Sequence, residues 1–314
     1  MPSDVPTNTK SHWWSSPYLL LTLTSLFWSL NWVIGRAVVG KVPPIALAYW
    51  RWVIAVLIML PFAIPQIRRS WPLIWKHRGV IALLALVGTG FHNMVSYIGL
   101  QYTTATNGVM LNSAIPVLIV LLGVLFFRQR VVATQVIGVA ISLTGVLAIM
   151  CKGHLETLGT LQFNIGDLIV LGSMLLWALY TLMLKWRPDG IPPIAFLCVC
   201  GIIGVAAMTP VYVWDAAHGM TIEWSWPVVG ALIYLGLFPS FIGYIFWNKG
   251  VEQLGANVSG LFVHLMPVFG SLLSWLFLDE RLYWFHFAGI ALILAGIFLT
   301  TWFARQPVLP AGEE

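Results

Sequence analysis

The chain has 314 residues, of which 59% are hydrophobic and only 9% are charged, and its formal net charge is +5. Soluble globular proteins carry about 25% charged residues, so this composition excludes an ordinary pair of soluble domains. A surface that faces lipid needs almost no charge, and we therefore expect most of the chain to lie in a bilayer.

Ten segments, at about 20 residues each, are apolar enough to cross a bilayer as helices. They cover residues 17–36, 44–64, 78–100, 104–127, 131–150, 165–184, 192–214, 228–249, 256–278 and 283–303. No small-residue cleavage site follows the first segment, so we expect a retained helix and not a signal peptide. The predicted fold is an all-α polytopic membrane protein with ten transmembrane helices and connections too short for a further domain.

The positions of Lys and Arg indicate the orientation, because cytoplasmic connections carry an excess of both residues. With a cytoplasmic N-terminus, eleven of the 16 basic residues fall on the cytoplasmic side. The outer side receives Arg36, Lys41, Lys152 and Arg281, and Arg51 lies within the second span. We therefore predict that both termini are cytoplasmic. Since topology explains the positive charge, nothing in it supports a nucleic-acid partner.

The sequence repeats itself after about half its length. Residues 42–46 recur as residues 191–195 at an offset of 149, and further on an offset of 151 pairs Pro116 with Pro267. Each half, at residues 17–150 and 165–303, then contains five helices. Because five is odd, the second half enters the membrane from the opposite side, which makes the repeat inverted. Inverted halves supply two conformations, each open to one side, so secondary transport is the first function that they suggest.

The two halves share further features. Each has a tryptophan near the middle of its first helix, Trp28 or Trp177, and the second half adds the motifs Gly166-Asp167-Leu168, Trp247-Asn248 and Pro267 followed by Leu278-Asp279-Glu280-Arg281. With the 5+5 repeat, these features resemble the EamA family of the drug/metabolite transporter superfamily over residues 17–303, and within it the YddG-type exporters of aromatic amino acids. The resemblance implies a transporter of the bacterial inner membrane. The first half departs from the pattern, with Arg128-Gln129 where the second has Asp279-Glu280.

Neutral polar and aromatic residues form stripes on several predicted helices. Polar residues inside a bilayer are costly and usually face the bundle interior or a water-filled cavity. The residues that we expect to line a substrate cavity are Trp28, Asn31, His92, Asn93, Tyr97, Asn112, Trp177, Tyr180, Tyr244, Trp247, Asn248 and His264. The alternative is that these side chains make polar contacts between packed helices.

Three residues within the spans leave two interpretations open. Pro116 and Pro267 each free a backbone carbonyl of their own helix, and the resulting kinks could be hinges for a rocking motion or static bends. Arg51 is the one basic residue well inside a span, about 10 Å along the helix from Pro44. Because that depth allows the side chain to snorkel to the outer surface, we expect a structural anchor, with a clamp for a substrate carboxylate as the alternative.

None of the eleven acidic residues lies near the middle of a predicted span. Ion-coupled transporters usually place a carboxylate there, so we expect facilitated diffusion, or proton coupling through His92 or His264. The predicted activity is export of small metabolites, foremost amino acids with apolar or aromatic side chains, without a cofactor or metal. An organophosphate or nucleotide-sugar exchanger would need facing Lys or Arg residues. An intramembrane enzyme would need paired carboxylates or metal ligands, which the spans do not offer.

Overall fold

A computed structural model describes residues 16–38, 40–103, 108, 111–129, 131–154, 156, 164–278 and 281–304. This part of the chain is helical and contains no strand. Its main helices are α1 (Pro17–Ala37), α2 (Pro44–Lys76), α3 (Arg78–Leu84), α4 (His92–Tyr102), α6 (Ile115–Leu125), α7 (Ala133–Met150), α9 (Ile165–Met183), α10 (Pro193–Ala217), α11 (Trp226–Leu235), α12 (Gly243–Leu261), α13 (Leu265–Leu278) and α14 (Trp284–Ala304).

Eight helical runs in the described residues are long and apolar enough to cross a membrane. The expected eighth and ninth spans form one run, Trp226–Leu273, which bends at Gly255, whose φ of 79° favours glycine. The expected fourth span lies partly outside the described residues, and α6 covers only Ile115–Leu125 of it. The protein is thus a multi-pass membrane protein, while the count of ten spans stays a prediction.

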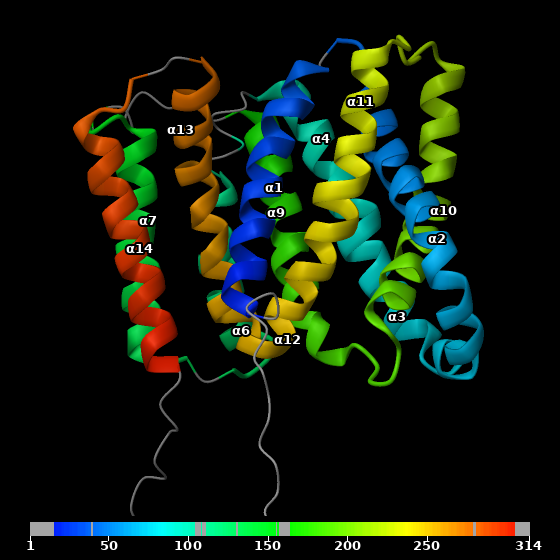
Figure 1. Cartoon of the computed structure of the whole chain (residues 1–314), viewed down its shortest axis with the longest axis horizontal. Coiled ribbons are helices and arrows are strands. Elements are labelled where there is room, and N and C mark those ends of the chain that lie inside the picture. The colour runs from blue at the N-terminus through cyan, green and yellow to red at the C-terminus, as the bar shows by residue number, and fades with distance from the viewer. Residues whose placement is uncertain are drawn as a thin grey trace, which may run out of the picture.

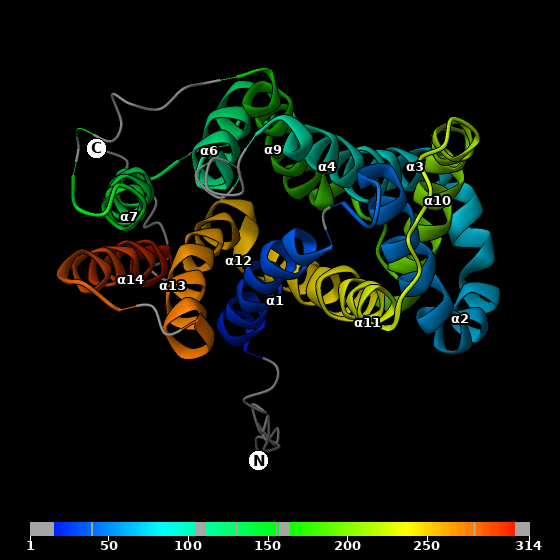
Figure 2. The same cartoon turned by 90° about the horizontal axis from the view of Figure 1, so that it is seen from above.

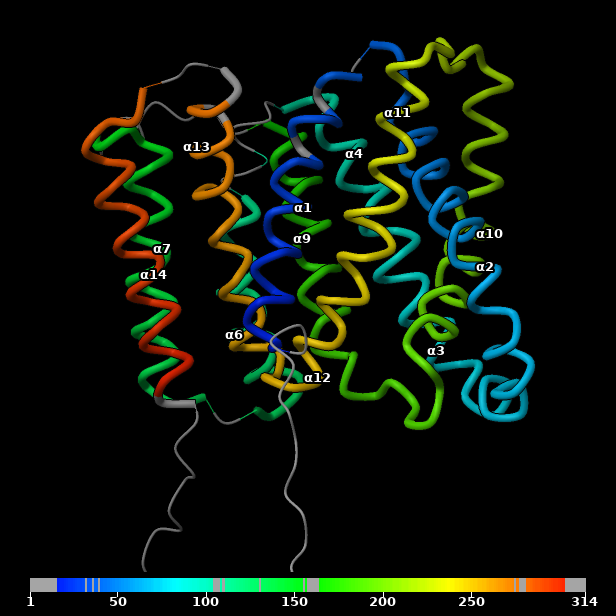
Figure 3. Tube along the Cα trace, viewed as in Figure 1, coloured from blue at the N-terminus to red at the C-terminus, as the bar shows by residue number. Residues whose placement is uncertain are grey.

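The helices of the two halves run in opposite directions. In Figure 1, α1 rises from the lower to the upper face, whereas α9 descends from the upper to the lower face. The tube in Figure 3 shows the same opposition between α2 and α10. Seen from above, α7 and α14 form a pair at one edge, α2 and α10 lie at the opposite edge, and α1, α4, α9 and α12 lie between them (Figure 2). The start of α1 and the end of α14 both lie at the lower face.

Local sequence signals explain where several helices begin. Pro44 and Pro193 occupy the first turns of α2 and α10, where the missing backbone N–H costs no hydrogen bond. Asn164 and Asp167 form a reciprocal cap at the start of α9, in which the Asn164 backbone N–H donates to Asp167 Oδ2 over 2.8 Å. Asp167 is therefore a helix cap. In contrast, α2 passes through three prolines and ends at Lys76, well beyond the expected end at residue 64.

Small residues allow the helices of the two halves to pack closely. On α7, a Cβ atom added to Gly145 would lie 2.6 Å from the Gly289 carbonyl oxygen of α14. On α4, a Cβ atom at Gly99 would lie 2.7 Å from Val170 Cγ2 of α9. Membrane helices use such residues because apolar lipid offers no hydrophobic driving force for helix association, and packing must supply it. The glycines on these faces are packing residues.

Two π-helical segments interrupt the long helices at matching places. One covers Ala85–Phe91 between α3 and α4, and the other covers Gly236–Ile242 between α11 and α12. Their bounds differ by 151 residues, the offset of the sequence repeat. Neither segment is apparent from hydrophobic periodicity. π-Helical turns inside α-helices are frequent at functional sites, and both segments lie beside the cavity described below.

The surface of the bundle suits lipid. Large apolar side chains are exposed along the outer helices, among them Leu57, Phe62, Leu121, Leu168 and Phe298. The three cysteines, Cys151, Cys198 and Cys200, are buried and form no disulfide. Water would oppose such exposure of apolar surface, whereas the hydrocarbon core of a bilayer does not.

Candidate functional site

A cavity of about 370 Å³ lies between α1, α2, α4, α9 and α12. Its lining includes Gly40, Pro43 and Thr221, from the connections that precede α2 and α11, and both connections lie at the upper face of Figure 1, opposite the ends of the described chain. Its interior is lined by aromatic, sulphur-containing and neutral polar side chains together with one arginine. A concave pocket of this size, mostly apolar with a few convergent polar groups, is typical of a small-molecule site.

Arg51 of α2 supplies the charge in this cavity. Its Nε donates to Ser240 Oγ over 2.8 Å, and its Nη1 donates to Tyr97 Oη over 2.7 Å and to Asn31 Oδ1 over 3.2 Å. The side chain is 3% exposed, so neighbouring helices hold it in the bundle interior and it does not snorkel to the surface. Among the described residues, no hydrogen bond uses Nη2. The expected snorkelling to the outer surface is therefore wrong, and Arg51 belongs to the lining of the cavity.

Two residues of α4 add neutral polar groups to the lining. His92 Nδ1 lies 2.8 Å from the Ser173 carbonyl oxygen, which can only accept, so Nδ1 carries the hydrogen and Nε2 is an acceptor in the neutral ring. Asn93 Nδ2 donates to Tyr244 Oη over 3.1 Å, so its Oδ1 stays available as an acceptor. The cavity thus combines one cationic donor with several neutral hydrogen-bonding groups.

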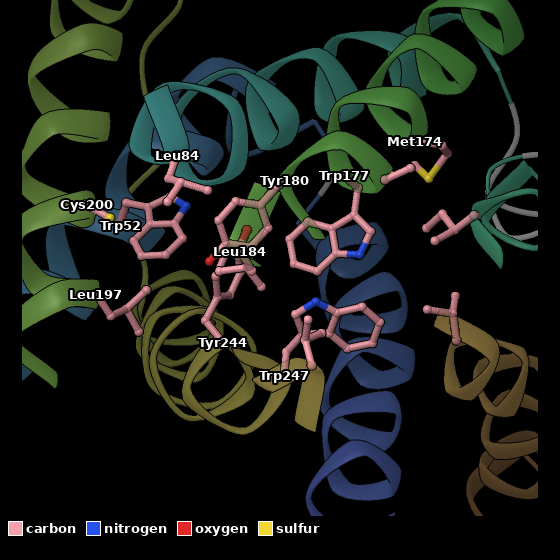
Figure 4. Close-up of a cluster of buried hydrophobic side chains, with 14 of the residues drawn as sticks. Trp52, Leu84, Met174, Trp177, Tyr180, Leu184, Leu197, Cys200, Tyr244 and Trp247 are labelled. Carbon is pink, nitrogen blue, oxygen red and sulfur yellow. The ribbon is translucent and has the colours of Figure 1, made fainter. Parts of the chain in front are cut away.

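Aromatic rings close the cavity at its inner end. Trp177 is the hub of this aromatic barrier, with ring centroids 5.0 Å from Trp28, 5.2 Å from Tyr244, 5.3 Å from Tyr180 and 5.5 Å from Trp247. Figure 4 shows the side chains of α9 and α12 that meet here. Tyr180 and Trp247 are completely buried. Neither of these two side chains lines the cavity, so we infer that they close it at this end.

A second cavity, of about 310 Å³, lies on the other side of the aromatic barrier. Its lining includes Thr181 and Asn248, which bond to the barrier itself. Tyr180 Oη donates to Asn248 Oδ1 over 2.9 Å, and Trp247 Nε1 donates to Thr181 Oγ1 over 3.3 Å. Lys185 and Glu252 also line this second cavity, together with residues of the connection between α9 and α10, which lies at the lower face in Figure 1. Two cavities thus approach one barrier from opposite faces.

The structure brings most of the expected cavity residues together. Those that line the main cavity are Trp28, Asn31, His92, Asn93, Tyr97, Asn112, Trp177 and Tyr244. Three expected residues lie deeper, because Tyr180 and Trp247 belong to the barrier and Asn248 lines the second cavity. The four-residue spacing of Tyr244 and Asn248 puts both on one helix face. Four residues span about 6 Å along a helix, however, and the barrier lies between them.

His264 lines neither cavity. It is completely buried, and its ring joins Ser142 of α7 to the backbone near the start of α6, through Ser142 Oγ at 2.6 Å and the Ser113 carbonyl oxygen at 3.0 Å. This histidine connects helices and does not line the main cavity. Pro116 and Pro267 fall in the first turns of α6 and α13, so they do not interrupt regular helix, although a three-residue 3₁₀ turn, Phe262–His264, precedes α13.

Residues that correspond between the two halves contact one another at three places. Trp28 packs against Trp177, Asn93 bonds to Tyr244, and the Ser113 carbonyl bonds to His264. The first pair is separated by 149 residues and the other two by 151, the two offsets of the sequence repeat. Residues related by a twofold axis can touch only near that axis. These contacts therefore trace an approximate twofold axis through the aromatic barrier.

The comparison with known families identifies the family to which this chain belongs. The sequence profile of the EamA-like transporter family matches residues 15–151 and again residues 164–302. The chain belongs to the EamA-like transporter family. Its relatives in Bacillus subtilis (strain 168) include "Uncharacterized transporter YyaM", 27% identical over 95% of this chain and 97% of its own length. Another is "Uncharacterized transporter YetK", 31% identical over 90% of this chain and 86% of its own length.

More distant similarities extend beyond bacteria and to a solved structure. A "WAT1-related protein" of Arabidopsis thaliana is 23% identical over 81% of this chain and 77% of its own length. A protein of known crystal structure, 20% identical, matches 93% of this chain and 98% of its own length with a TM-score of 0.70, which supports the fold alone. The EamA family and the names of the relatives point to a membrane transporter and not to an enzyme. In the described residues, no group of three His, Cys, Asp or Glu side chains could hold a metal ion.

Proposed function

We propose that this protein is a secondary transporter that exports zwitterionic metabolites, foremost amino acids with apolar or aromatic side chains. In this proposal it works by alternating access between two inverted five-helix halves, residues 17–150 and 165–303. It lies in the cytoplasmic membrane of a bacterium with both termini in the cytoplasm. The basis for the location is the bacterial relatives together with the distribution of Lys and Arg.

The side chains that line the main cavity support the proposed substrate class. A guanidinium group is a strong charge-assisted donor to a carboxylate, and the Nη2 of Arg51, which no hydrogen bond uses among the described residues, can donate to one next to the amide of Asn31. His92 Nε2 and Asn93 Oδ1 are acceptors suited to an ammonium group. The rings of Trp28 and Trp177 and the side chain of Met174 offer an apolar surface for a substrate side chain. An amino acid satisfies all three features at once.

Alternating access is supported by differences between corresponding residues. Trp28 Nε1 donates to the Pro239 carbonyl oxygen over 3.1 Å, whereas Trp177 Nε1, its counterpart, is buried and has no partner among the described residues. The carbonyl that corresponds to Pro239 belongs to Gly88, and it accepts from Tyr244 Oη over 2.8 Å. Two halves with related sequences thus adopt different conformations here. An inverted-repeat transporter that is open to one side requires such a difference.

A second candidate, exchange of organic phosphates, is favoured by Arg51 alone. Phosphate groups also bind guanidinium groups through paired hydrogen bonds. The main cavity holds no second Lys or Arg among its lining residues in the described chain, and a doubly charged phosphate would then keep one charge without a partner. A zwitterion fits better, because its single carboxylate matches the single arginine.

Counterflow into proteoliposomes tests the substrate class. Vesicles loaded with unlabelled phenylalanine are expected to accumulate labelled phenylalanine, leucine or tryptophan at rates well above those of protein-free vesicles. Lysine is expected to be a poor substrate, because the main cavity has no acidic residue among its described lining to balance a second positive charge. Two results together would replace this proposal with the phosphate exchanger. The protein would drive no counterflow of any amino acid, and it would drive counterflow of labelled phosphate that excess glycerol phosphate inhibits.

Thiol labelling tests the orientation of the protein in the membrane and the opening of its main cavity to the outer side alone. We expect a membrane-impermeant maleimide added to intact cells to label Ser96→Cys, which lines the main cavity, severalfold more than Val251→Cys, which lines the second cavity. After permeabilisation, Val251→Cys should react. The wild-type protein serves as the background, because its three cysteines are buried. Labelling of Val251→Cys alone from outside would show that the predicted orientation is reversed.

A further inference from the structure

Arg51 is a buried positive charge that only neutral groups hold. Its three hydrogen bonds go to the side-chain oxygens of Ser240, Asn31 and Tyr97. Among the described residues the one ion pair joins Arg187 to Glu252 over 3.3 Å, at the second cavity. The guanidinium of arginine stays protonated in proteins, so it cannot lose its charge by releasing a proton. In this conformation the cavity is the route by which water or a solute anion can reach it.

The charge of Arg51 has no equivalent at the corresponding position of the second half. The residue that corresponds to Arg51 in the second half is Cys200, on α10. The Ser240 hydroxyl accepts from Arg51, and its counterpart, the Thr89 hydroxyl, donates to the Cys200 carbonyl oxygen over 2.9 Å. The two positions are therefore equivalent in the fold, and each contacts a hydroxyl of the matching π-helical segment, but only Arg51 carries a charge. Cys200 is 1% exposed and lines neither cavity.

Alternation between the two conformations changes the surroundings of Arg51. In an inverted-repeat transporter, each half adopts in one state the conformation that the other half has in the opposite state. When the main cavity closes, Arg51 would move into surroundings like those of Cys200 now, shut off from both cavities. Burying an unpaired charge is costly, whereas a bound carboxylate that moves with the charge offsets much of that cost.

We propose that Arg51 makes this protein an obligatory exchanger of carboxylate-bearing solutes. The carrier changes its access when a carboxylate is bound to Arg51, and the empty carrier does not return across the membrane at a useful rate. This inference rests on the proposed transport function and adds the mode of transport to it. It also makes the carboxylate, and not the side chain of the substrate, the group that permits the conformational change.

The test compares exchange with net uptake in the same proteoliposomes. Vesicles loaded with phenylalanine should take up labelled leucine at least about tenfold faster than empty vesicles, because the return of the empty carrier buries an unpaired charge. Vesicles loaded with phenylalaninamide, which lacks the carboxylate, should behave like empty ones. Equal uptake into empty and loaded vesicles would overturn the inference and leave the transport function intact. Absence of counterflow with every solute would overturn both.

Variants of Arg51 test whether this residue causes the dependence of uptake on an internal carboxylate. Arg51→Gln keeps hydrogen-bonding groups without the charge and should raise net uptake to within about threefold of exchange, since the cost of burying a charge is removed. Arg51→Lys keeps the charge and should keep the dependence on an internal carboxylate. Exchange-dependent uptake that persists in Arg51→Gln would overturn the role of this residue. The comparison of phenylalanine with its amide needs no variant, so it decides the inference even if the glutamine variant fails to fold.

Discussion

Replacing Trp177 by alanine is expected to have the largest effect of any single substitution in the site. The indole ring packs against four other aromatic rings and, at 5.0 Å, against the His92 ring. Its removal leaves a void among these rings, and the loss of a large aromatic side chain typically costs about 3–5 kcal/mol. The void would also join the two cavities. We therefore expect a lower thermal unfolding temperature in detergent and leakage of small solutes from proteoliposomes.

Trp71→Ala is the matched control for the aromatic barrier. Trp71 is 53% exposed near the end of α2, where an indole ring contributes to the interfacial belt and not to the barrier. Its removal should leave solute retention unchanged and reduce stability much less. Equal stability and equal solute retention in the two variants would show that Trp177 does not close the main cavity.

Gly145→Ala is expected to destabilise the protein through the pair formed by α7 and α14. A Cβ atom at this position would lie 2.6 Å from the Gly289 carbonyl oxygen and 2.9 Å from the Ile293 backbone nitrogen. Because backbone atoms cannot rotate away as side chains do, the two helices must separate. Overpacking of this kind typically costs about 1–3 kcal/mol. The unfolding temperature in detergent measures the effect.

The control for this prediction has the opposite expected sign. At Gly172 of α9, a Cβ atom would meet nothing within 4 Å. Alanine there should be neutral or stabilising, because glycine inside a helix costs about 1 kcal/mol relative to alanine. If Gly145→Ala were as stable as Gly172→Ala, close packing of α7 against α14 would not be a requirement of the fold.

Much of the fold could be predicted because lipid imposes simple rules. Apolar runs of sufficient length become helices, since the bilayer leaves backbone groups no other partners. The repeat at offsets of 149 and 151 likewise anticipated that corresponding helices run in opposite directions. Hydropathy did not predict the extension of α2 to Lys76 or the two π-helical segments. Both depend on backbone hydrogen bonding, which an average over apolar residues does not capture.

The candidate site was only partly predictable. Helical spacing assigned Trp28, His92 and Tyr244 to inward faces, because periodicity reports direction around a helix axis. It could not separate Tyr244, which lines the main cavity, from Asn248, which lines the second. Depth relative to the barrier depends on where the rings of other helices lie. His264 illustrates the same limit, because its partners on α6 and α7 are distant in sequence.

The amino-acid sequence by itself determined that the protein lies in a membrane, that it is built from two related halves, and that the polar groups of its interior are nearly all uncharged. These properties follow from composition and periodicity, to which every residue contributes. Only the tertiary structure decided the place of Arg51. The sequence indicated the depth of this residue in the bilayer, whereas its role depends on Asn31, Tyr97 and Ser240. Those partners come from three other helices, and packing alone brings them together around the charge.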